Sequence, residues 1–268
     1  MRTIGFMGAG NMGSAILRGG VSTGYINPAK LAVCDVNSER LVELQAEYPE
    51  MMIADNIMEL AGCCDVIVLA VKPYQLGAVL EEAEGLLAGK LLISIAAGWT
   101  MAMLDRALEG SGASWIRVMP NTPALVGEGM TAICKENNLT EGDFAYVKGL
   151  FDEIGRTAVL PEKQFDGAIA ISGSSPAYIF MLIEAMADAG VREGLQRATA
   201  YEMAAQSVLG AALMVLTTGT HPGELKDNVC SPGGTTIEAV SVLEKEGFRS
   251  VVMEAMKACA DKSRKMSE

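Results

Sequence analysis

The chain has 268 residues, of which 50% are hydrophobic and 20% charged, and this length is enough to bury a sizeable core in one or two domains. The net charge of −12 and the lack of a basic run argue against nucleic acid as a partner. Six scattered cysteines without a C-x-x-C pair, together with a single histidine, predict no metal site. No stretch approaches the roughly 18 consecutive apolar residues of a membrane span, and nothing directs export. We therefore expect a cytoplasmic protein without a membrane partner.

The first part of the chain alternates short apolar runs with helical patterns. Strands are predicted at residues 2–7, 31–35, 64–73, 91–98 and 115–120, and helices at 11–23, 38–47, 75–87 and 100–109. This alternation favours the α/β class with a doubly wound parallel sheet. Two further apolar runs, "MTAICKE" and "TAVLPE", extend the sheet at its far edge. We expect residues 1–162 to form one domain.

After residue 163 the strand signals vanish, and residues 163–268 are predicted to form an all-helical domain. Two of its helices, at 174–190 and 199–216, are apolar on most sides, which is typical of buried helices. About 105 residues of helix can hardly bury two such helices alone. We therefore expect them to be buried against another subunit, with a compact monomeric bundle as the alternative.

A glycine loop follows the first predicted strand and opens a helix. In "GFMGAGNMG", Gly8, Gly10 and Gly13 form a G-x-G-x-x-G pattern. Gly8 permits the tight turn, Gly10 lets the backbone approach a pyrophosphate, and Gly13 lets the helix pack close to the strand. The positive end of the helix faces the phosphates. The loop therefore predicts a dinucleotide-binding domain.

Asp35 ends the second predicted strand, 22 residues after Gly13. An acid at this place can hold a ribose 2′-hydroxyl, which favours NAD(H), and it would repel a 2′-phosphate. Asn37, Ser38 and Arg40 could instead donate to that phosphate, or they could be a turn, a helix cap and an exposed charge. We expect NADH to be favoured slightly and NADPH to be tolerated.

Three other places offer polar groups. Lys72 ends a strand, where it could face the cofactor or only solvent. Asn121 and Thr122 in "MPNTP" could donate beside a nicotinamide, or the segment could be only a stiff turn. His221, the only histidine, is interpreted as a turn residue near a helix start, and its isolation argues against a Ser-His-Asp hydrolase.

The stretch "CSPGGTTIE" is a second candidate anion site. Thr235 and Glu238 have capping-box spacing, which would leave the hydroxyl of Thr236 free in the first turn. Ser231 and the N–H groups of Gly233, Gly234 and Thr235 would surround a concavity suited to a carboxylate. A simple loop-to-helix turn is the alternative.

Together these stretches resemble one family, pyrroline-5-carboxylate reductase, over essentially the whole chain. The similar blocks are "GFMGAGNMGSAI", "LAVKP", "SIAAG", "RVMPNTPALVGEGMT", "SGSSPAYIFMLIEAMADAG" and "HPGELKDNVCSPGGTTIEAV". The resemblance implies that NAD(P)H gives hydride to the C=N carbon of Δ1-pyrroline-5-carboxylate, which yields L-proline. It also implies an N-terminal Rossmann domain and a helical domain that interlocks in a homodimer, and dimers of this family commonly assemble into decamers.

The resemblance also implies site residues, position by position. Gly8, Ala9, Gly10, Asn11, Met12 and Gly13 would hold the pyrophosphate, and Asn56, Ala70, Val71, Lys72 and Pro73 would line the dinucleotide. Ala96, Ala97 and Asn121 would lie near the nicotinamide, and Asn228 and Val229 would approach it from the helical domain. Ser231, Gly233, Gly234 and Thr235 would bind the substrate carboxylate, and Thr236 would hydrogen-bond the ring nitrogen. Asp35 departs from the family pattern, because many members lack an acid there and contact a 2′-phosphate.

Two other functions remain open at this point. A β-hydroxyacid-type dehydrogenase shares the glycine loop and a helical second domain, and usually depends on a lysine there; Lys226 is the only lysine between Lys163 and Lys245. A non-catalytic dinucleotide sensor would need the glycine loop but not "SPGGTT".

Overall fold

The computed structural model describes residues 2–267. Its described residues fall into two compact units, one running up to Ser174 and including the segment from Cys259 onward, and the other spanning Ser175–Ala258. The second unit therefore interrupts the first in the sequence. The predicted domain boundary after residue 162 stays a prediction, because compactness and function need not divide a chain at the same residue.

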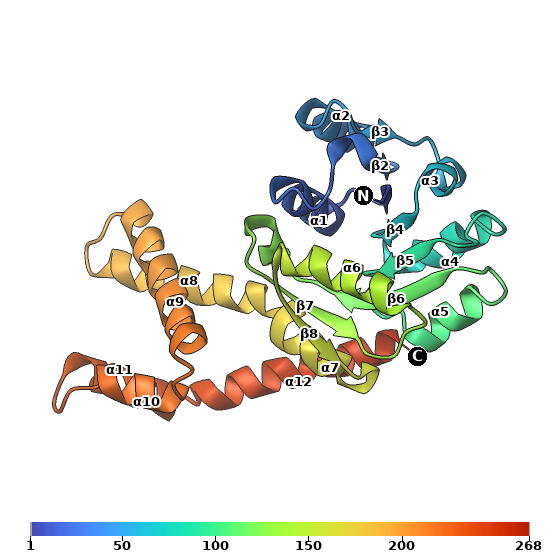
Figure 1. The fold of residues 1–268 in the computed structure, drawn as a ribbon. Coiled ribbons are helices and arrows are strands. Elements are labelled where there is room, and N and C mark those ends of the chain that lie inside the picture. The colour runs from blue at the N-terminus through green and yellow to red at the C-terminus, as the bar shows by residue number, and fades with distance from the viewer. Residues whose placement is uncertain (1, 268) are drawn as a thin grey trace. The chain divides into compact units, whose positions relative to one another are not determined.

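Within the described residues, the first unit is built on an eight-stranded sheet of order β3-β2-β1-β4-β5-β6-β7-β8 (Figure 1). The strands are β1 (Ile4–Met7), β2 (Leu31–Cys34), β3 (Met52–Ile53), β4 (Val66–Leu69), β5 (Leu91–Ser94), β6 (Ser114–Met119), β7 (Gly129–Cys134) and β8 (Gly155–Leu160). All neighbours from β3 to β6 pair in parallel, whereas β7 is antiparallel to β6 and parallel to β8. The predicted parallel sheet and its extension by the last two strands are confirmed.

Helices cover both faces of this sheet. They are α1 (Asn11–Ser22), α2 (Ser38–Glu47), α3 (Ile57–Cys63), α4 (Pro73–Glu82), α5 (Met101–Ala107) and α6 (Glu141–Asp152), with 3₁₀ turns η1 (Pro28–Lys30), η2 (Thr122–Val126) and η3 (Glu162–Gln164). Side chains alternate along each strand, so Val66 and Val68 join the core under α1, α2 and α6, while Ile67 and Leu69 join the core under α3, α4 and α5. Both faces are buried, as the continuous apolar runs indicated.

Helices follow the last strand, as predicted. Helix α7 (Phe165–Ala168) runs into a π-helical turn, η4 (Ile169–Gly173). Five helices come next: α8 (Ser175–Arg192), α9 (Arg197–Thr218), α10 (Pro222–Val229), α11 (Thr235–Lys245) and α12 (Phe248–Met266). Only the last part of α12 belongs to the first unit. There the Sγ of Cys259 lies 3.2 Å from the Oγ of Ser174, and the hydroxyl of Ser263 donates to Asp166 Oδ1 at 2.6 Å.

The second unit leaves most of its apolar surface uncovered in the single chain. Among its described residues the buried hydrophobic side chains are Ala187, Ala200 and Ala204. Exposed apolar side chains include Ile179, Phe180, Met181, Met186, Met203, Leu209, Leu213, Met214, Leu216, Val251, Val252 and Met253. Two helical stretches, Glu162–Arg192 and Arg197–Thr218, are long and apolar enough to cross a membrane by length and composition. Such faces require a cover, which lipid or a second protein chain can supply.

Candidate functional site

The glycine loop lies at the carboxyl end of β1, beside the carboxyl end of β4 where the strand order reverses. Gly8 has φ +104°, and a Cβ there would lie 2.7 Å from the carbonyl oxygen of Ala70. A Cβ on Gly13 would lie 2.3 Å from the carbonyl oxygen of Gly8. A Cβ on Gly10 would meet nothing within 4 Å. Gly8 and Gly13 are thus required by packing, whereas Gly10 leaves open space beside the backbone.

The start of α1 offers free backbone donors to such an anion. Gly10 is its N-cap residue, and no side chain caps the helix. The N–H groups of the first turn therefore have no intrahelical acceptor, and they point along the positive end of the helix dipole. The buried hydroxyl of Ser14 donates to the carbonyl of Ala9 at 2.6 Å and fixes the loop to the helix.

Asp35 is tied to the glycine loop. Its Oδ2 accepts from the N–H of Ala9 at 2.5 Å, and its Oδ1 accepts from the N–H of Asn37 at 2.8 Å. The carboxylate therefore holds the loop and its own turn together at the edge where a ribose would lie. Burial, followed by the charge of Asp35, raises the pKa of the neighbouring Cys34 thiol, which keeps that thiol neutral.

The alternative donors after Asp35 have local roles in this structure. The side chain of Asn37 caps α2 by accepting from the N–H of Arg40 at 3.2 Å. Ser38 is the first residue of α2. The Arg40 guanidinium lies 3.9 Å from the carboxylate of Glu43. The turn and helix-cap interpretation of this segment is confirmed with one change, because Asn37 rather than Ser38 caps the helix, and Arg40 is half-buried rather than fully exposed.

The carboxyl ends of β4 and β5 carry the next predicted residues. The N–H of Ala70 donates to the carbonyl of Met7, so this strand end is fixed against the glycine loop. Lys72 is exposed, and Pro73 begins α4. The indole of Trp99 donates to the carbonyl of Pro73 at 2.8 Å, which joins this turn to the segment that holds Ala96 and Ala97.

Two predicted amides are engaged by the protein itself. Asn56 caps α3 by accepting from the N–H of Glu59 at 2.9 Å. Asn121, which is 7% exposed, donates through Nδ2 to the carbonyl of Ser172 and accepts through Oδ1 from the N–H of Met130. The MPNTP turn is thus linked to β7 and to the π-helical turn, and one N–H of the Asn121 amide stays available to a ligand.

A buried ion pair near this edge was not predicted from the sequence. Arg117 on β6 is 3% exposed, donates to Glu162 Oε1 at 2.8 Å and stacks over the ring of Phe165. The same Glu162 oxygen accepts from the N–H of Met101 at 2.6 Å. The pair therefore fixes the start of α5. The one available signal was an arginine inside the apolar run "WIRVMP", since a charge there needs a partner.

The remaining predicted residues lie in the second unit, in and before α11. Gly233 has φ +66°, and the N–H of Gly234 donates to the carbonyl of Ser231 at 3.0 Å. Gly234 is the N-cap residue of α11, without a side-chain cap, and Thr235 is the first helical residue. The predicted capping box of Thr235 and Glu238 is therefore wrong. The left-handed glycine lets the helix begin one residue earlier, which leaves the first-turn N–H groups uncapped.

The neighbouring residues of α10 are exposed or make contacts within their own helix. His221 is the N-cap residue of α10 and accepts from the N–H of Gly223 at 3.1 Å through Nδ1, which confirms its interpretation as a turn residue. Lys226 pairs with Asp227 at 2.5 Å. Asn228 and Val229 end the helix with exposed side chains.

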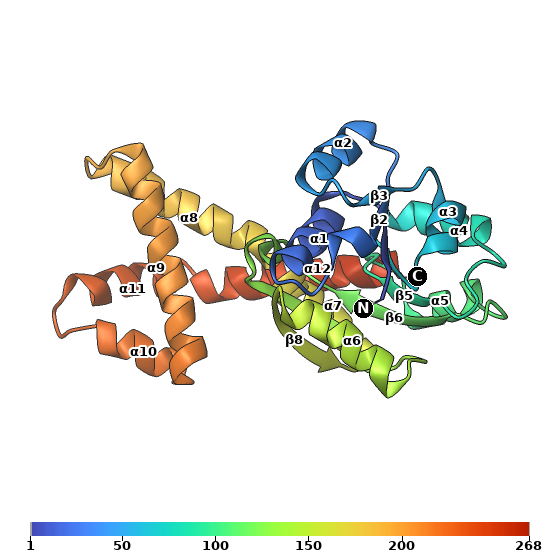
Figure 2. The same cartoon turned by 45° about the horizontal axis from the view of Figure 1, so that its top comes forward.

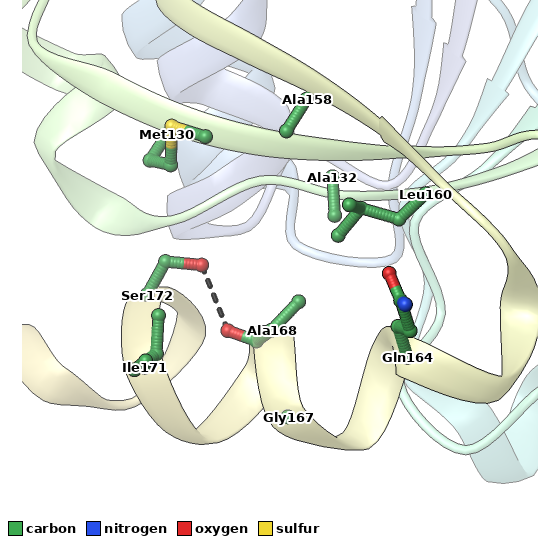
Figure 3. Close-up of a pocket in the computed structure, with 9 residues that line it drawn as sticks. All are labelled: Met130, Ala132, Ala158, Leu160, Gln164, Gly167, Ala168, Ile171 and Ser172. Atoms are coloured by element: carbon green, nitrogen blue, oxygen red, sulfur yellow. Dashed lines mark hydrogen bonds between the residues drawn. The ribbon is translucent and has the colours of Figure 1, made fainter.

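A separate apolar pocket lies between β7, β8 and the α7–η4 segment of the first unit (Figure 3). Its volume is about 260 Å³, and its lining residues are Met130, Ala132, Ala158, Leu160, Gln164, Gly167, Ala168, Ile171 and Ser172. The hydroxyl of Ser172 donates a hydrogen bond to the carbonyl of Ala168 at 2.8 Å. None of the predicted site residues lines this pocket, so we do not place the chemistry there.

Comparison with known proteins identifies the class. Residues 162–266 match the family described as pyrroline-5-carboxylate reductase dimerisation, and residues 3–98 match the family described as NADP oxidoreductase, coenzyme F420-dependent. The pyrroline-5-carboxylate reductase of Escherichia coli is 48% identical over 268 residues, which is 100% of this chain and 99% of that protein. The Methanosarcina acetivorans enzyme is 41% identical, over 99% of this chain and 98% of its own length.

Solved structures agree. The Plasmodium falciparum pyrroline carboxylate reductase with NADP bound has a TM-score of 0.90 and 37% identity, covering 100% of this chain and 98% of that one. A Coxiella burnetii pyrroline-5-carboxylate reductase has a TM-score of 0.88 and 33% identity, covering 100% and 99%. Fold, glycine loop and matches define an NAD(P)H-dependent oxidoreductase acting on an imine, with a Rossmann-type sheet and a helical dimerisation region.

The chain belongs to the pyrroline-5-carboxylate reductase family. This assignment confirms the predicted fold class and displaces both alternative functions, the β-hydroxyacid-type dehydrogenase and the dinucleotide sensor. The dimerisation match also indicates that a second protein chain, rather than lipid, covers the apolar helices.

Proposed function

We propose that this chain reduces Δ1-pyrroline-5-carboxylate to L-proline with NAD(P)H, as the last step of proline synthesis in the cytoplasm. The observation that carries the proposal is the similarity over the full chain to enzymes named for this reaction, combined with a glycine loop shaped for a pyrophosphate. The loop from Gly8 to Gly13 would hold the pyrophosphate. The residues from Ala70 to Pro73, with Asn56, would line the dinucleotide, and Ala96, Ala97 and Asn121 would lie near its nicotinamide.

The substrate carboxylate would bind at the start of α11. The turn from Ser231 to Gly234 and the missing side-chain cap leave backbone N–H groups of the first turn without acceptors. Such groups, at the positive end of a helix dipole, suit a single carboxylate. Ser231, Gly233 and Thr235 would make these contacts, and Gly234, whose N–H already donates to the carbonyl of Ser231, would lie against the carboxylate. Asn228 and Val229, which are exposed just before the turn, would approach the nicotinamide.

The proposed reaction does not require a strong general acid or base from the protein. Reduced nicotinamide, when bound, supplies the hydride. The hydroxyl of Thr236 would hydrogen-bond the ring nitrogen, and no strong acid is needed if the substrate binds as its iminium form. The main work of these residues is to orient the imine carbon toward the incoming hydride, which lowers the entropic part of the barrier.

An absorbance assay at the reduced-nicotinamide band, with pyrroline-5-carboxylate as the substrate, tests the proposal directly. We expect substrate-dependent oxidation of the cofactor. Absence of oxidation with both NADH and NADPH would refute the proposed reaction.

Thr236→Ala tests the role of the hydroxyl at the ring nitrogen. We expect kcat to fall by roughly tenfold or more, which is about the worth of one hydrogen bond that strengthens in the transition state, with little change in NADH affinity. Thr235→Ala is the matched control, because it keeps the backbone N–H and Thr235 does not cap the helix. Equal effects of the two substitutions would remove Thr236 from the mechanism.

Asp35 would favour NADH by accepting from the ribose 2′-hydroxyl and by repelling a 2′-phosphate. Asp35→Asn removes the charge and keeps one oxygen acceptor, so at least one of the two bonds to Ala9 and Asn37 can persist. We expect the ratio of kcat/KM for NADPH to that for NADH to rise. An unaltered ratio would show that Asp35 only holds the glycine loop.

The proposed assembly is a homodimer through the helical unit, with dimers assembling into a larger homo-oligomer such as a decamer. The uncovered apolar faces of α8, α9 and α12 support the dimer. Native mass spectrometry measures the state: dimers alone would contradict the larger assembly, and monomers would contradict both.

A further inference from the structure

The segment between β5 and α5, residues 95–100, contacts parts of the first unit that are distant in the sequence. Within the segment, the indole of Trp99 donates to the carbonyl of Pro73. Directly after the segment, the N–H of Met101 donates to Glu162, which Arg117 holds in place. Gly98, which directly precedes Trp99, lies against Met266, the last residue of α12. The C-terminal end of α12 is near the start of α5 in both views of the fold (Figures 1 and 2).

The contact between Gly98 and Met266 leaves no room for a side chain. Gly98 is buried and has φ +81°. A Cβ there would lie 2.9 Å from the carbonyl oxygen of Met266 and 3.1 Å from its Cβ. The first of these atoms is part of the helix backbone and the second is attached directly to it, so neither can move unless the backbone moves. Both the left-handed conformation and the close approach therefore require glycine at this position.

The end of α12 is itself fixed, so it can act as a support. The hydroxyl of Ser263, which is 6% exposed, donates to Asp166 Oδ1 at 2.6 Å. One helical turn later, the hydroxyl of Ser267 donates to the carbonyl of Ser263 at 3.4 Å. A helix end held in this way does not fray freely, and its position is transmitted to Gly98 by direct contact.

We propose that the last turn of α12 is a positioning element for the cofactor: Met266 holds the Gly98 segment so that the backbone at Ala96 and Ala97 faces the nicotinamide ring. The inference rests on the proposed function, which places Ala96 and Ala97 beside that ring. Met266 touches no reacting atom in this role and acts only through Gly98. Because hydride transfer depends steeply on orientation, a displacement of a fraction of an ångström at this segment reduces turnover.

Gly98→Ala tests the contact, and Gly110→Ala is its matched control. Gly110 has φ +75° and nothing within 4 Å of an added Cβ, so the control carries the same backbone strain without a neighbour. We expect Gly98→Ala to weaken NADH binding and to lower kcat by about tenfold or more, while KM for pyrroline-5-carboxylate changes less than about twofold. Gly110→Ala leaves all three quantities near those of the parent chain.

Rescue separates positioning from general damage. Met266→Gly removes the Cβ that lies 3.1 Å away and gives the helix end the backbone freedom to move its carbonyl oxygen, the nearer contact at 2.9 Å, so Gly98→Ala combined with Met266→Gly regains cofactor affinity and kcat. Equal behaviour of Gly98→Ala and Gly110→Ala, or failure of the second substitution to restore either quantity, overturns the proposal. If Gly98→Ala does not fold, Met266→Gly alone decides: weaker NADH binding at an unchanged melting temperature supports the proposal, and unchanged binding overturns it.

The readouts also keep this inference separate from the reaction itself. NADH affinity is measured by titrating the fluorescence of the reduced cofactor, without a substrate. A parent chain that binds NADH but never oxidises it with pyrroline-5-carboxylate contradicts the proposed function. The binding comparison between Gly98→Ala and Gly110→Ala still tests the positioning role in that case.

Discussion

The two units of the chain solve the problem of burying apolar surface in different ways. In the first, side chains such as Phe6, Val68 and Phe151 are fully buried between a sheet and helices of the same unit. In the second, the described buried hydrophobic residues are three alanines, and long side chains such as Phe180 and Leu213 stay exposed. The first unit therefore carries its own core, whereas the second exposes apolar faces in the part of the chain that matches a dimerisation family, and we propose that a second copy covers them.

The largest effect is expected where a charge is placed on the uncovered faces. Phe180 on α8 is 63% exposed in the single chain and Val42 on α2 is 65% exposed, so exposure alone does not distinguish them. We expect Phe180→Lys to raise the dissociation constant of the dimer by about 30- to 1,000-fold, because an interface residue is lost on both chains. Val42→Lys leaves it unchanged. Light scattering across a dilution series measures both, and equal behaviour would break the comparison between the units.

The next effect separates two glycines of one loop in the first unit. Gly13→Ala places a Cβ against the carbonyl of Gly8, so we expect the free energy of unfolding to fall by about 1–3 kcal/mol, together with a loss of NADH binding. Gly10→Ala meets open space in the protein, so stability is retained while NADH affinity falls. Thermal unfolding and cofactor fluorescence measure the two quantities. A Gly10 variant with normal affinity would mean that the pyrophosphate does not approach there.

A smaller effect compares ion pairs in the two units. Glu162→Gln leaves the guanidinium of Arg117 buried without its counter-charge, and we expect a loss of about 1–2 kcal/mol in stability, because Glu162 itself is 27% exposed. Asp188→Asn breaks the exposed pair between Asp188 and Arg197, and we expect a much smaller loss because solvent screens this pair. Urea unfolding of the two variants measures the difference. Similar losses would indicate that the buried pair is screened by water.

The smallest effect concerns the hydrogen bonds between Thr3 and Asp65, just before β1 and β4, and it depends on pH. Hydrogen bonds from the backbone and side chain of Thr3 lower the pKa of Asp65. Stability from this carboxylate is therefore fully present above the unfolded-state pKa of about 3.9 and is lost as pH falls through the lower folded-state value. We expect Asp65→Asn to cost about 0.5 kcal/mol at pH 7, since Asp65 is largely exposed, and less at pH 3. The exposed Glu109→Gln serves as control, and a cost that grows at low pH would contradict the assignment.

Much of the first unit could be predicted from local patterns. Apolar runs bounded by glycine or proline placed the longer strands, and the glycine spacing placed the turn between β1 and α1. Strand β3 was missed because it has only two residues and Met52 is exposed. The antiparallel direction of β7 was also not predicted, since periodicity marks a strand without giving its direction.

The rest required three-dimensional contacts. Arg117 and Glu162 are 45 residues apart, and the sequence around either residue does not indicate that the two form a pair. The start of α11 shifted by one residue because a left-handed Gly233 decides it, and capping-box spacing cannot detect that conformation. The contact of Met266 with Gly98 depends on the return of α12 to the first unit, which no composition or period indicates.

The return of α12 also sets an order of events during synthesis. The partners of Asp166 and Gly98 are Ser263 and Met266, which the ribosome adds only after the whole of Ser175–Ala258 has been made. At usual rates of translation, that interval is on the order of ten seconds. During this time the first unit lacks its contacts with the end of α12, and the apolar helices of the second unit are already synthesised. Nascent chains of this protein therefore pass through a stage in which chaperone protection matters more than it does for the completed chain.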